Sequence, residues 1–217
     1  MNEQRRAPAT AWSAPHGTPG HPPSLPGLRV LVVCTANVSR SPLAAAMLRD
    51  VLRPLAASAE VRSAGVDAAP HLGIDRRAVD AGRELGITVG DHVPQQVTPT
   101  TLLWANLVLA MTREHVRELV LIEPTVFPRA FTLKQFVRLA VDGPMVGEPI
   151  ESWVDRTGAG RQMRDLVGED TSDDVSDPYG GSASTHRRVA LELHELTSQI
   201  GARLLARGAT AAQGPET

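Results

Sequence analysis

A cysteine and an arginine separated by five residues are the pair with the clearest chemical potential in this chain. Cys34 is the only cysteine among the 217 residues, and Arg40 follows it in the run Cys-Thr-Ala-Asn-Val-Ser-Arg-Ser. A thiolate is a strong nucleophile, and a guanidinium can donate two parallel hydrogen bonds to two oxygens of an anion. Residues 34–41 therefore have the composition of a loop that holds a tetrahedral oxyanion beside a nucleophile.

The elements on either side of this loop would place both groups at a ligand site. Residues 28–33 (LRVLVV) are almost all apolar, which predicts a strand covered on both faces. Ser41-Pro42 and the run LAAAMLRDVL after them predict a helix with proline in its first turn. The free backbone N–H groups and the dipole at that helix start favour an anion and a thiolate. A small buried cysteine that closes the strand is the alternative for Cys34 considered alone.

The rest of the chain alternates strand patterns and helix patterns. Three further strands and five further helices are predicted, the strands at 60–63, 106–111 and 130–131 and the helices at 75–85, from 98, 112–121, 132–140 and 184–207. The alternation predicts a three-layer α/β/α fold with a central, mostly parallel four-stranded sheet. The composition of residues 34–41 adds a phosphate-binding loop after strand 1. Ligands of such sheets bind at the carboxyl ends of the strands, where Cys34 is expected.

Composition divides the chain into one folded domain and two ends. Residues 1–27 hold six of the 17 prolines and are expected to be disordered, as is the tail at 208–217. Residues 28–207 are expected to form the domain. A flexible acidic insertion at about 142–176 interrupts it and is interpreted as a long loop, with a brief helical turn at 163–167.

Charge and residue usage exclude several classes of protein. The net charge of −2 argues against a nucleic-acid partner, and no run of about 20 apolar residues predicts a membrane span. A single cysteine cannot form an internal disulfide, and the seven histidines lack metal-ligand spacing, so we expect no metal and no cofactor. We expect a cytoplasmic protein that is a monomer or a weak dimer.

The run VLVVCTANVSRSPLAAAML resembles the amino terminus of low-molecular-weight protein tyrosine phosphatases. The match continues with Ser63-Ala64-Gly65, Ala110-Met111-Thr112 and Asp177-Pro178-Tyr179. The resemblance covers about residues 28–141 and 174–206. It implies an enzyme that hydrolyses phosphotyrosine in protein substrates through a cysteinyl-phosphate intermediate, with a tyrosine kinase as one candidate partner.

The resemblance also implies a role for each catalytic residue. Cys34 would attack phosphorus, Arg40 would hold the phosphoryl oxygens, and Asp177 would protonate the departing phenolate. Asp177 would then deprotonate the water that hydrolyses the intermediate. The alternative interpretation of Asp177 is a turn residue before proline, with no catalytic role. The phosphate-binding residues would be Thr35, Ala36, Asn37, Val38, Ser39, Arg40 and Ser41.

Four residues would support the loop in this family pattern. Asn37 would hold its shape through left-handed backbone geometry, and Ser41 would hydrogen-bond the thiolate. Ser63 and His92 match a hydrogen-bond network behind the loop. The alternatives are a simple helix cap for Ser41 and a solvated loop histidine for His92.

The chain departs from the family around the substrate pocket. Many members have an aromatic wall where this chain has Ala69, so Tyr179 is expected to supply one side of the entrance. Val38 resembles the branched apolar residue of tyrosine-directed members rather than the threonine of arginine-phosphate-directed ones. Ser39 stands where many members have a second cysteine, which removes a protective disulfide with Cys34.

Other functions stay open beside phosphotyrosine hydrolysis. Arsenate reduction occurs on the same fold, and here it would need an external low-molecular-weight thiol because resolving cysteines are absent. The chain could also act on another phosphomonoester. A catalytically weak phosphate-binding module is disfavoured because Cys34, Arg40 and Asp177 are all present.

Overall fold

A four-stranded sheet forms the centre of the computed structural model, which describes residues 27–55, 59–145, 147–168 and 170–211. The strand order is β2-β1-β3-β4, and every neighbouring pair is parallel. The strands are β1 (Leu28–Cys34), β2 (Ala59–Gly65), β3 (Leu107–Ala110) and β4 (Ala130–Thr132). The predicted α/β fold with a parallel four-stranded sheet is confirmed.

The central strand β1 explains the apolar run that precedes the loop. It pairs with β2 along its whole length and with β3 on its other side. Val30 and Val32 point into one hydrophobic cluster, whereas Leu31 and Val33 point into another. Because both faces of the strand are covered, its residues are apolar without alternation.

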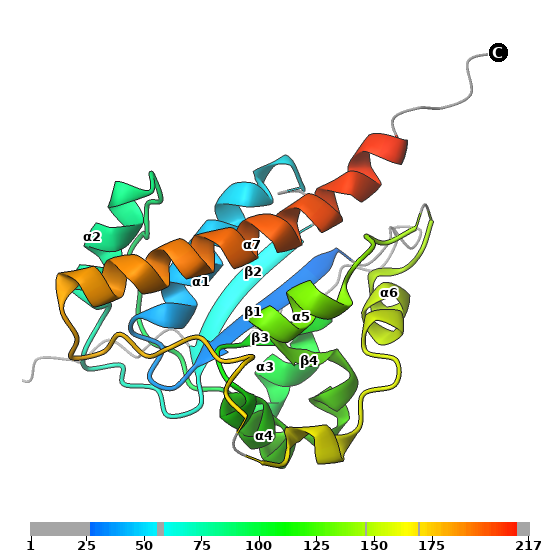
Figure 1. Ribbon diagram of the computed structural model, residues 1–217, viewed down its shortest axis with the longest axis horizontal. Helices are drawn as coiled ribbons and strands as arrows, with labels where there is room; N and C mark the ends of the chain where they lie inside the picture. The colour runs from blue at the N-terminus through cyan, green and yellow to red at the C-terminus, as the bar shows by residue number, and fades with distance from the viewer. Residues whose placement is uncertain (1–26, 56–58, 146, 169, 212–217) are drawn as a thin grey trace, which may run out of the picture.

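Helices cover both faces of the sheet, as Figure 1 shows for α1 and α7 on one face and α3 and α4 on the other. The helices that contribute to the first cluster are α1 (Arg40–Val51), α2 (Arg76–Glu84), α5 (Leu133–Leu139), α6 (Ile150–Thr157) and α7 (Ala183–Ala211). The second cluster involves α3 (Pro99–Trp104), α4 (Arg113–Ile122), η2 (Pro124–Arg129) and η3 (Met163–Leu166). A short helix η1 (Arg53–Leu55) follows α1.

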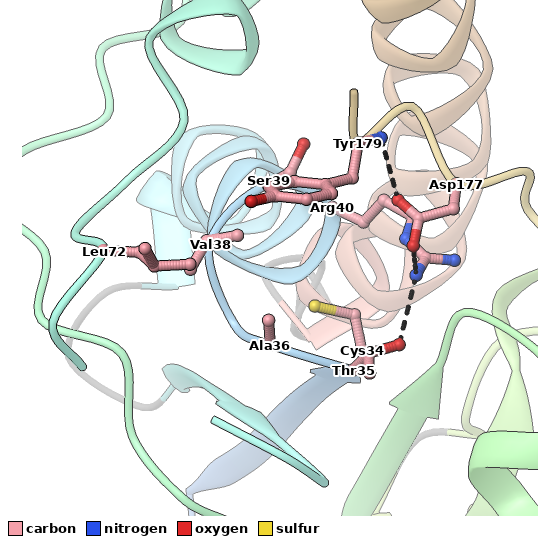
Figure 2. A pocket seen from close by; sticks show the side chains of 9 residues that line it. All are labelled: Cys34, Thr35, Ala36, Val38, Ser39, Arg40, Leu72, Asp177 and Tyr179. Carbon is pink, nitrogen blue, oxygen red and sulfur yellow. Dashed lines mark hydrogen bonds and ion pairs between the residues drawn. The ribbon is translucent and has the colours of Figure 1, made fainter. Parts of the chain in front are cut away.

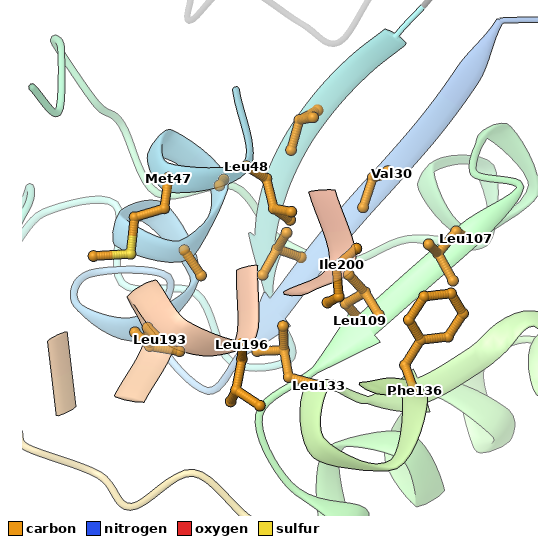
Figure 3. Close-up of a cluster of buried hydrophobic side chains, with 14 of the residues drawn as sticks. Val30, Met47, Leu48, Leu107, Leu109, Leu133, Phe136, Leu193, Leu196 and Ile200 are labelled. Atoms are coloured by element: carbon orange, nitrogen blue, oxygen red, sulfur yellow. The ribbon is translucent and has the colours of Figure 1, made fainter. Parts of the chain in front are cut away.

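The long helix α7 closes the first face of the sheet. Its stripe of buried side chains follows helical spacing, as the sequence predicts, and consists of Val189, Leu193, Leu196, Ile200 and Leu204. Figure 3 shows Ile200 close to Leu109 of β3, with Leu193 toward α1. These contacts hold α7 against the sheet and α1.

The interpretation of residues 142–176 as one long loop is wrong, because α6 lies within it. Trp153 of this helix is fully buried, and its ring meets Phe136 edge to face with 5.5 Å between the centroids. Its Nε1 donates to the main-chain oxygen of Asp142 at 3.0 Å. Packing on Phe136 of α5 and the hydrogen bond to Asp142 thus stabilise a helix of only eight residues.

The predicted carboxyl end of the fold also needs a correction. Residues 208–211 continue α7 instead of belonging to an unstructured tail. The expected disorder of residues 1–26 and 212–217 falls outside the described residues. Among the helices that the structure does describe, none combines the length and the apolar composition needed to cross a membrane.

Candidate active site

The loop at residues 34–41 forms the floor of a cavity of about 260 Å³ at the carboxyl edge of the sheet (Figure 2). Arg40 and Ser41 already belong to the first turn of α1, so the loop curls around the amino terminus of that helix. The first N–H groups of a helix have no partner within it and can bind an anion. The residues that line the cavity are Cys34, Thr35, Ala36, Val38, Ser39, Arg40, Leu72, Asp177 and Tyr179.

The thiol of Cys34 has a polar partner within the loop. Its Sγ lies 2.9 Å from Oγ of Ser41, and both residues are buried. The Ser41 oxygen accepts a hydrogen bond from Nδ2 of Asn37 at 2.9 Å and donates to the carbonyl oxygen of Ala64 at 3.3 Å. A hydroxyl has one hydrogen and can rotate, so Ser41 can turn this hydrogen from Ala64 toward Sγ when Cys34 is a thiolate.

Asn37 sets the shape of the loop through its backbone and its side chain. Its φ of 57° is the one positive value for a non-glycine residue in the described chain. Its Oδ1 accepts from the amide of Gln95 at 2.8 Å, and its main-chain oxygen contacts Nε2 of His92 at 2.7 Å. Asparagine tolerates the left-handed region better than other non-glycine residues. The loop conformation is therefore fixed from behind by residues 92–95.

His92 is a hydrogen-bond partner of the loop in this structure. Burial lowers its pKa, the hydrogen bond to the Asn37 carbonyl acts in the opposite direction, and the charge of Arg49 lowers it further. The neutral ring with hydrogen on Nε2 satisfies the contact to Asn37, since a carbonyl can only accept. His92 thus lies behind the loop and contacts its main chain at Asn37.

Strand β2 contacts the loop through its main chain and not through the Ser63 hydroxyl, which the family resemblance had implied. In the described part of the chain, the loop contact comes from the Ala64 carbonyl, and no hydrogen bond joins the Ser63 hydroxyl to the loop. Gly65 lies against the loop so closely that a Cβ there would stand 2.3 Å from the carbonyl oxygen of Thr35. Glycine is required at this position because the two backbones approach each other.

The guanidinium of Arg40 is buried and held by three oxygens. Nη1 donates to the carbonyl of Val175 at 3.2 Å, and Nη2 donates to Oγ1 of Thr35 at 3.4 Å and to Oδ2 of Asp177 at 2.6 Å. Val175 is itself buried, and its amide donates to the carbonyl of Met111, directly after β3. The end of the insertion therefore docks on the sheet and orients the arginine.

Asp177 comes from the segment before α7, yet it reaches the loop. Its Oδ2 pairs with Arg40, while its Oδ1 accepts from the amide of Tyr179 at 3.1 Å. The side chain remains about half exposed, at 49%, on the open side of the cavity. A carboxyl group in this position can exchange protons with water and with an atom bound above Cys34.

His115 is a site residue that the sequence reasoning missed. Its Nε2 lies 2.9 Å from Oγ1 of Thr35, and its Nδ1 lies 2.8 Å from Oγ1 of Thr112. Burial lowers the pKa of His115 to about 4, and the charge of Arg40 adds to this, partly offset by Asp177. One sequence feature could have identified His115. It lies three residues after Thr112 and just beyond β3, and the carboxyl end of β3 is at the same edge of the sheet as Cys34.

The outer rim of the cavity is apolar, but not in the way expected. Ala69 donates its amide to the carbonyl of Ala36 at 3.1 Å and does not line the cavity. Leu72, 49% exposed, lines the cavity together with Val38, and Tyr179, 63% exposed, faces them (Figure 2). The wall beside the loop is thus aliphatic, and Tyr179 is the aromatic residue among those that line the cavity.

The assembled groups can carry out displacement at a tetrahedral anion. They comprise a thiol with a hydroxyl donor, a fixed guanidinium, a helix start and an exposed carboxyl group. In the described residues, no three His, Cys, Asp or Glu side chains are grouped so that they could hold a metal ion.

Comparisons with known proteins support this interpretation. Residues 29–152 match the family model described as low molecular weight phosphotyrosine protein phosphatase. A protein-arginine-phosphatase of Geobacillus stearothermophilus is 32% identical over 81% of this chain and 95% of its own length. A probable low molecular weight protein-tyrosine-phosphatase, EpsP of Ralstonia solanacearum, is 30% identical over 60% of this chain and 96% of its own.

The fold is shared with solved structures of such proteins. The structure of the YwlE arginine phosphatase from Geobacillus stearothermophilus superposes with a TM-score of 0.61 and 28% identity. The match covers 88% of this chain and 99% of that structure.

Proposed function

Since the chain belongs to the low molecular weight phosphotyrosine protein phosphatase family, we propose that it hydrolyses phosphotyrosine monoesters of proteins through a cysteinyl-phosphate intermediate. Cys34 is the nucleophile, Arg40 the clamp on the phosphoryl oxygens, and Asp177 the general acid and then the base. One observation carries the proposal: the thiol, the guanidinium and the carboxyl group line a single cavity at the start of α1.

In the first step the Cys34 thiolate attacks phosphorus while the bond from phosphorus to the phenolic oxygen breaks. Asp177 gives its proton to that oxygen, so tyrosine leaves as a neutral phenol. Arg40 and the N–H groups of residues 35–41 stabilise the charge on the three equatorial oxygens. The hydroxyl of Ser41, 2.9 Å from Sγ, stabilises the thiolate before attack and after release.

In the second step water attacks the phosphocysteine and the sulfur–phosphorus bond breaks. The carboxylate of Asp177, left without its proton by the first step, takes a proton from the attacking water. Inorganic phosphate and the Cys34 thiolate are the products. Asp177 remains accessible to water because its side chain is about half exposed.

The lining of the cavity favours an aromatic leaving group. Above the loop the walls are formed by Ala36, Val38, Leu72 and Tyr179, and Asp177 is the one acidic residue in the lining. A phenyl ring can bury its apolar faces against such walls. The N–H groups of a phosphorylated guanidine would meet few acceptors there, which costs free energy.

Phosphoarginine in proteins is the second candidate substrate. It is favoured by one observation: the relatives named protein-arginine-phosphatase match 81% of this chain, compared with 60% for the EpsP protein. In that reaction the leaving group would be a guanidine, and Asp177 would protonate its nitrogen.

Peptide hydrolysis distinguishes the two substrates. Phosphate release is measured from matched peptides that carry either phosphotyrosine or phosphoarginine, with Cys34→Ser as the inactive control. The proposal predicts a higher kcat/KM for the phosphotyrosine peptide than for the phosphoarginine peptide. Val38→Thr adds a hydroxyl acceptor to the cavity wall and should reduce this difference in kcat/KM. A higher kcat/KM for the phosphoarginine peptide would assign the second substrate.

The biological setting belongs to the same proposal. The substrates are phosphoproteins, phosphorylated by a tyrosine kinase. We place the enzyme in the cytoplasm as a monomer or weak dimer, because a nucleophilic thiol remains reduced in that compartment.

A further inference from the structure

A buried histidine and a partly buried aspartate join α2 to the start of α7, outside the residues assigned to catalysis. Nε2 of His186 lies 3.1 Å from Oδ2 of Asp75, and the His186 side chain is 1% exposed. Asp75 is the N-cap of α2, where its Oδ1 accepts from the amide of Arg77 at 2.8 Å. Figure 1 shows the amino-terminal part of α7 beside α2.

Both nitrogens of the His186 ring face groups that can only accept. Nδ1 lies 3.1 Å from the main-chain oxygen of Ser182, while Nε2 faces the Asp75 carboxylate. Each ring nitrogen thus lies within hydrogen-bond distance of an oxygen from a different segment. The ring therefore bridges the start of α2 and the residue that precedes α7.

Asp75 also contacts the phosphate loop. Its amide donates to the carbonyl oxygen of Val38 at 2.7 Å, a short main-chain bond to the middle of the loop. The bridge thus connects three elements in sequence: the loop through Val38, the start of α2 through Asp75, and the start of α7 through His186.

A turn that directly follows Asp177 lies between this residue and the His186 anchor. The amide of Gly181 donates to the carbonyl of Pro178 at 2.8 Å, which closes a turn over residues 178–181. Nη1 of Arg77 donates to the Gly181 carbonyl at 2.8 Å, a second link from α2 to the same turn. Tyr179 therefore lies within a turn, and Asp177 directly before it, and the far end of this turn is hydrogen-bonded to α2.

We propose that His186 is a positioning residue for the general acid, holding the turn with Asp177 at a fixed distance from the phosphate loop through Asp75. The inference rests on the proposed phosphatase function and assigns a role within it. His186 touches neither the substrate nor Cys34; its effect passes through Asp177. Without the bridge the turn moves relative to Cys34, and proton transfer to the leaving group becomes less efficient while attack by the thiolate continues.

The test compares two aryl phosphates. Phenolate is a more basic leaving group than para-nitrophenolate and depends more on protonation by Asp177. We expect His186→Phe, which keeps an aromatic ring and removes both side-chain hydrogen bonds, to lower kcat/KM about 30-fold for phenyl phosphate and about threefold for para-nitrophenyl phosphate. His186→Gln, which keeps one donor toward Asp75, should recover part of the loss for phenyl phosphate.

Two further variants separate positioning from general destabilisation. Arg187→Gln removes the exposed ion pair of α7 with Glu84 of α2 and should leave both substrates within about twofold of wild type. In an Asp177→Ala background, adding His186→Phe should lower kcat/KM by less than about twofold, since His186 acts through Asp177. Equal losses for both substrates, or the full loss persisting without Asp177, would overturn the inference.

Asp75→Asn and amide exchange keep the inference testable if His186→Phe does not fold. Asn retains the N-cap acceptor but replaces the oxygen that faces His186, so the same dependence on leaving group should appear. The amides of Tyr179 and Gly181 should exchange about tenfold faster in either variant; unchanged exchange contradicts the inference. If wild type hydrolyses neither ester, the proposed function fails, and amide exchange alone decides whether His186 holds the turn.

Discussion

Arg40 donates from Nη2 to Oδ2 of Asp177 at 2.6 Å, so the clamp for phosphate is paired with the proposed general acid. Arg40 lies in the interior and Asp177 at the surface, with side-chain exposures of 5% and 49%. A phosphate group that enters the loop must share the guanidinium with this carboxylate or displace it. The pairing makes anion affinity and acid catalysis depend on the same residue.

Asp177→Asn should therefore strengthen phosphate binding while it weakens hydrolysis. Removal of the negative charge ends the competition for Arg40, and we expect inorganic phosphate to bind about two- to fivefold more tightly. Hydrolysis of phenyl phosphate should fall by about 10²- to 10⁴-fold. Calorimetric titration with phosphate and steady-state rates check the two effects, and weaker phosphate binding by the variant would refute the competition.

Gly65→Ala should disturb the loop through a backbone collision. The added Cβ would lie 2.3 Å from the Thr35 carbonyl oxygen and 2.9 Å from the Asn37 amide. Because the nearest atoms are backbone, the loop must move, and we expect about a 10²-fold loss in kcat/KM. Gly90→Ala is the matched control, since no atom lies within 4 Å of its Cβ, and its activity should equal wild type. Wild-type activity of Gly65→Ala would mean that the loop tolerates the shift.

Asn37 separates the contribution of backbone strain from that of hydrogen bonds. Both Asn37→Gly and Asn37→Ala lose the contacts to Gln95 and Ser41, but only alanine is strained at a φ of 57°. We expect Asn37→Ala to have a free energy of unfolding about 1 kcal/mol lower than Asn37→Gly, as measured by urea denaturation. Equal stabilities would show that the left-handed backbone is not strained for alanine here.

His115 should make the fold less stable in mild acid. Burial, with the charge of Arg40, lowers its pKa from 6.5 to about 4. Between these values the unfolded chain binds a proton that the folded protein excludes, so stability falls as pH decreases and the effect is complete below about pH 4. Above pH 6.5 the ring is neutral in both states and contributes no dependence.

Urea denaturation at pH 7 and pH 4.5 measures this effect. We expect the free energy of unfolding of wild type to drop about 2–3 kcal/mol more than that of His115→Gln over this range. The glutamine variant serves as the control for all other titrating groups. Parallel decreases in the two proteins would show that His115 takes up its proton in the folded state.

Local patterns predicted most of the sheet and its helices because the buried strands have long apolar runs. β1 and β3 are covered on both faces, so their sequences are recognisable without knowledge of their neighbours. Thr98 and Thr112 accept hydrogen bonds from the third residue that follows each, which explains why their positions marked helix starts.

The missed helix α6 depends on contacts that the sequence does not display. Its eight residues lie between Pro149 and Gly158, too short for a periodic pattern. Trp153 fixes it by packing on Phe136 and by donating to the Asp142 carbonyl. Such tertiary contacts override weak local preference.

The site shows the same division between local and distant information. The loop from Cys34 to Arg40 is continuous in sequence and could be assigned as a unit. Leu72 and His115 reach the site through the arrangement of separate segments, one as the wall and one behind Thr35. A single sequence does not show directly that these residues lie close to the loop. Both segments do follow strands that end at the same edge of the sheet.

The central claim is that Cys34 carries out the chemistry. Steady-state hydrolysis of para-nitrophenyl phosphate by wild type and Cys34→Ser tests it most directly, with far-UV circular dichroism to show that both proteins are folded. Loss of the thiolate should lower kcat by at least about 10³-fold, because a serine hydroxyl is not ionised in this loop. A Cys34→Ser protein that turns over at the wild-type rate would contradict the account.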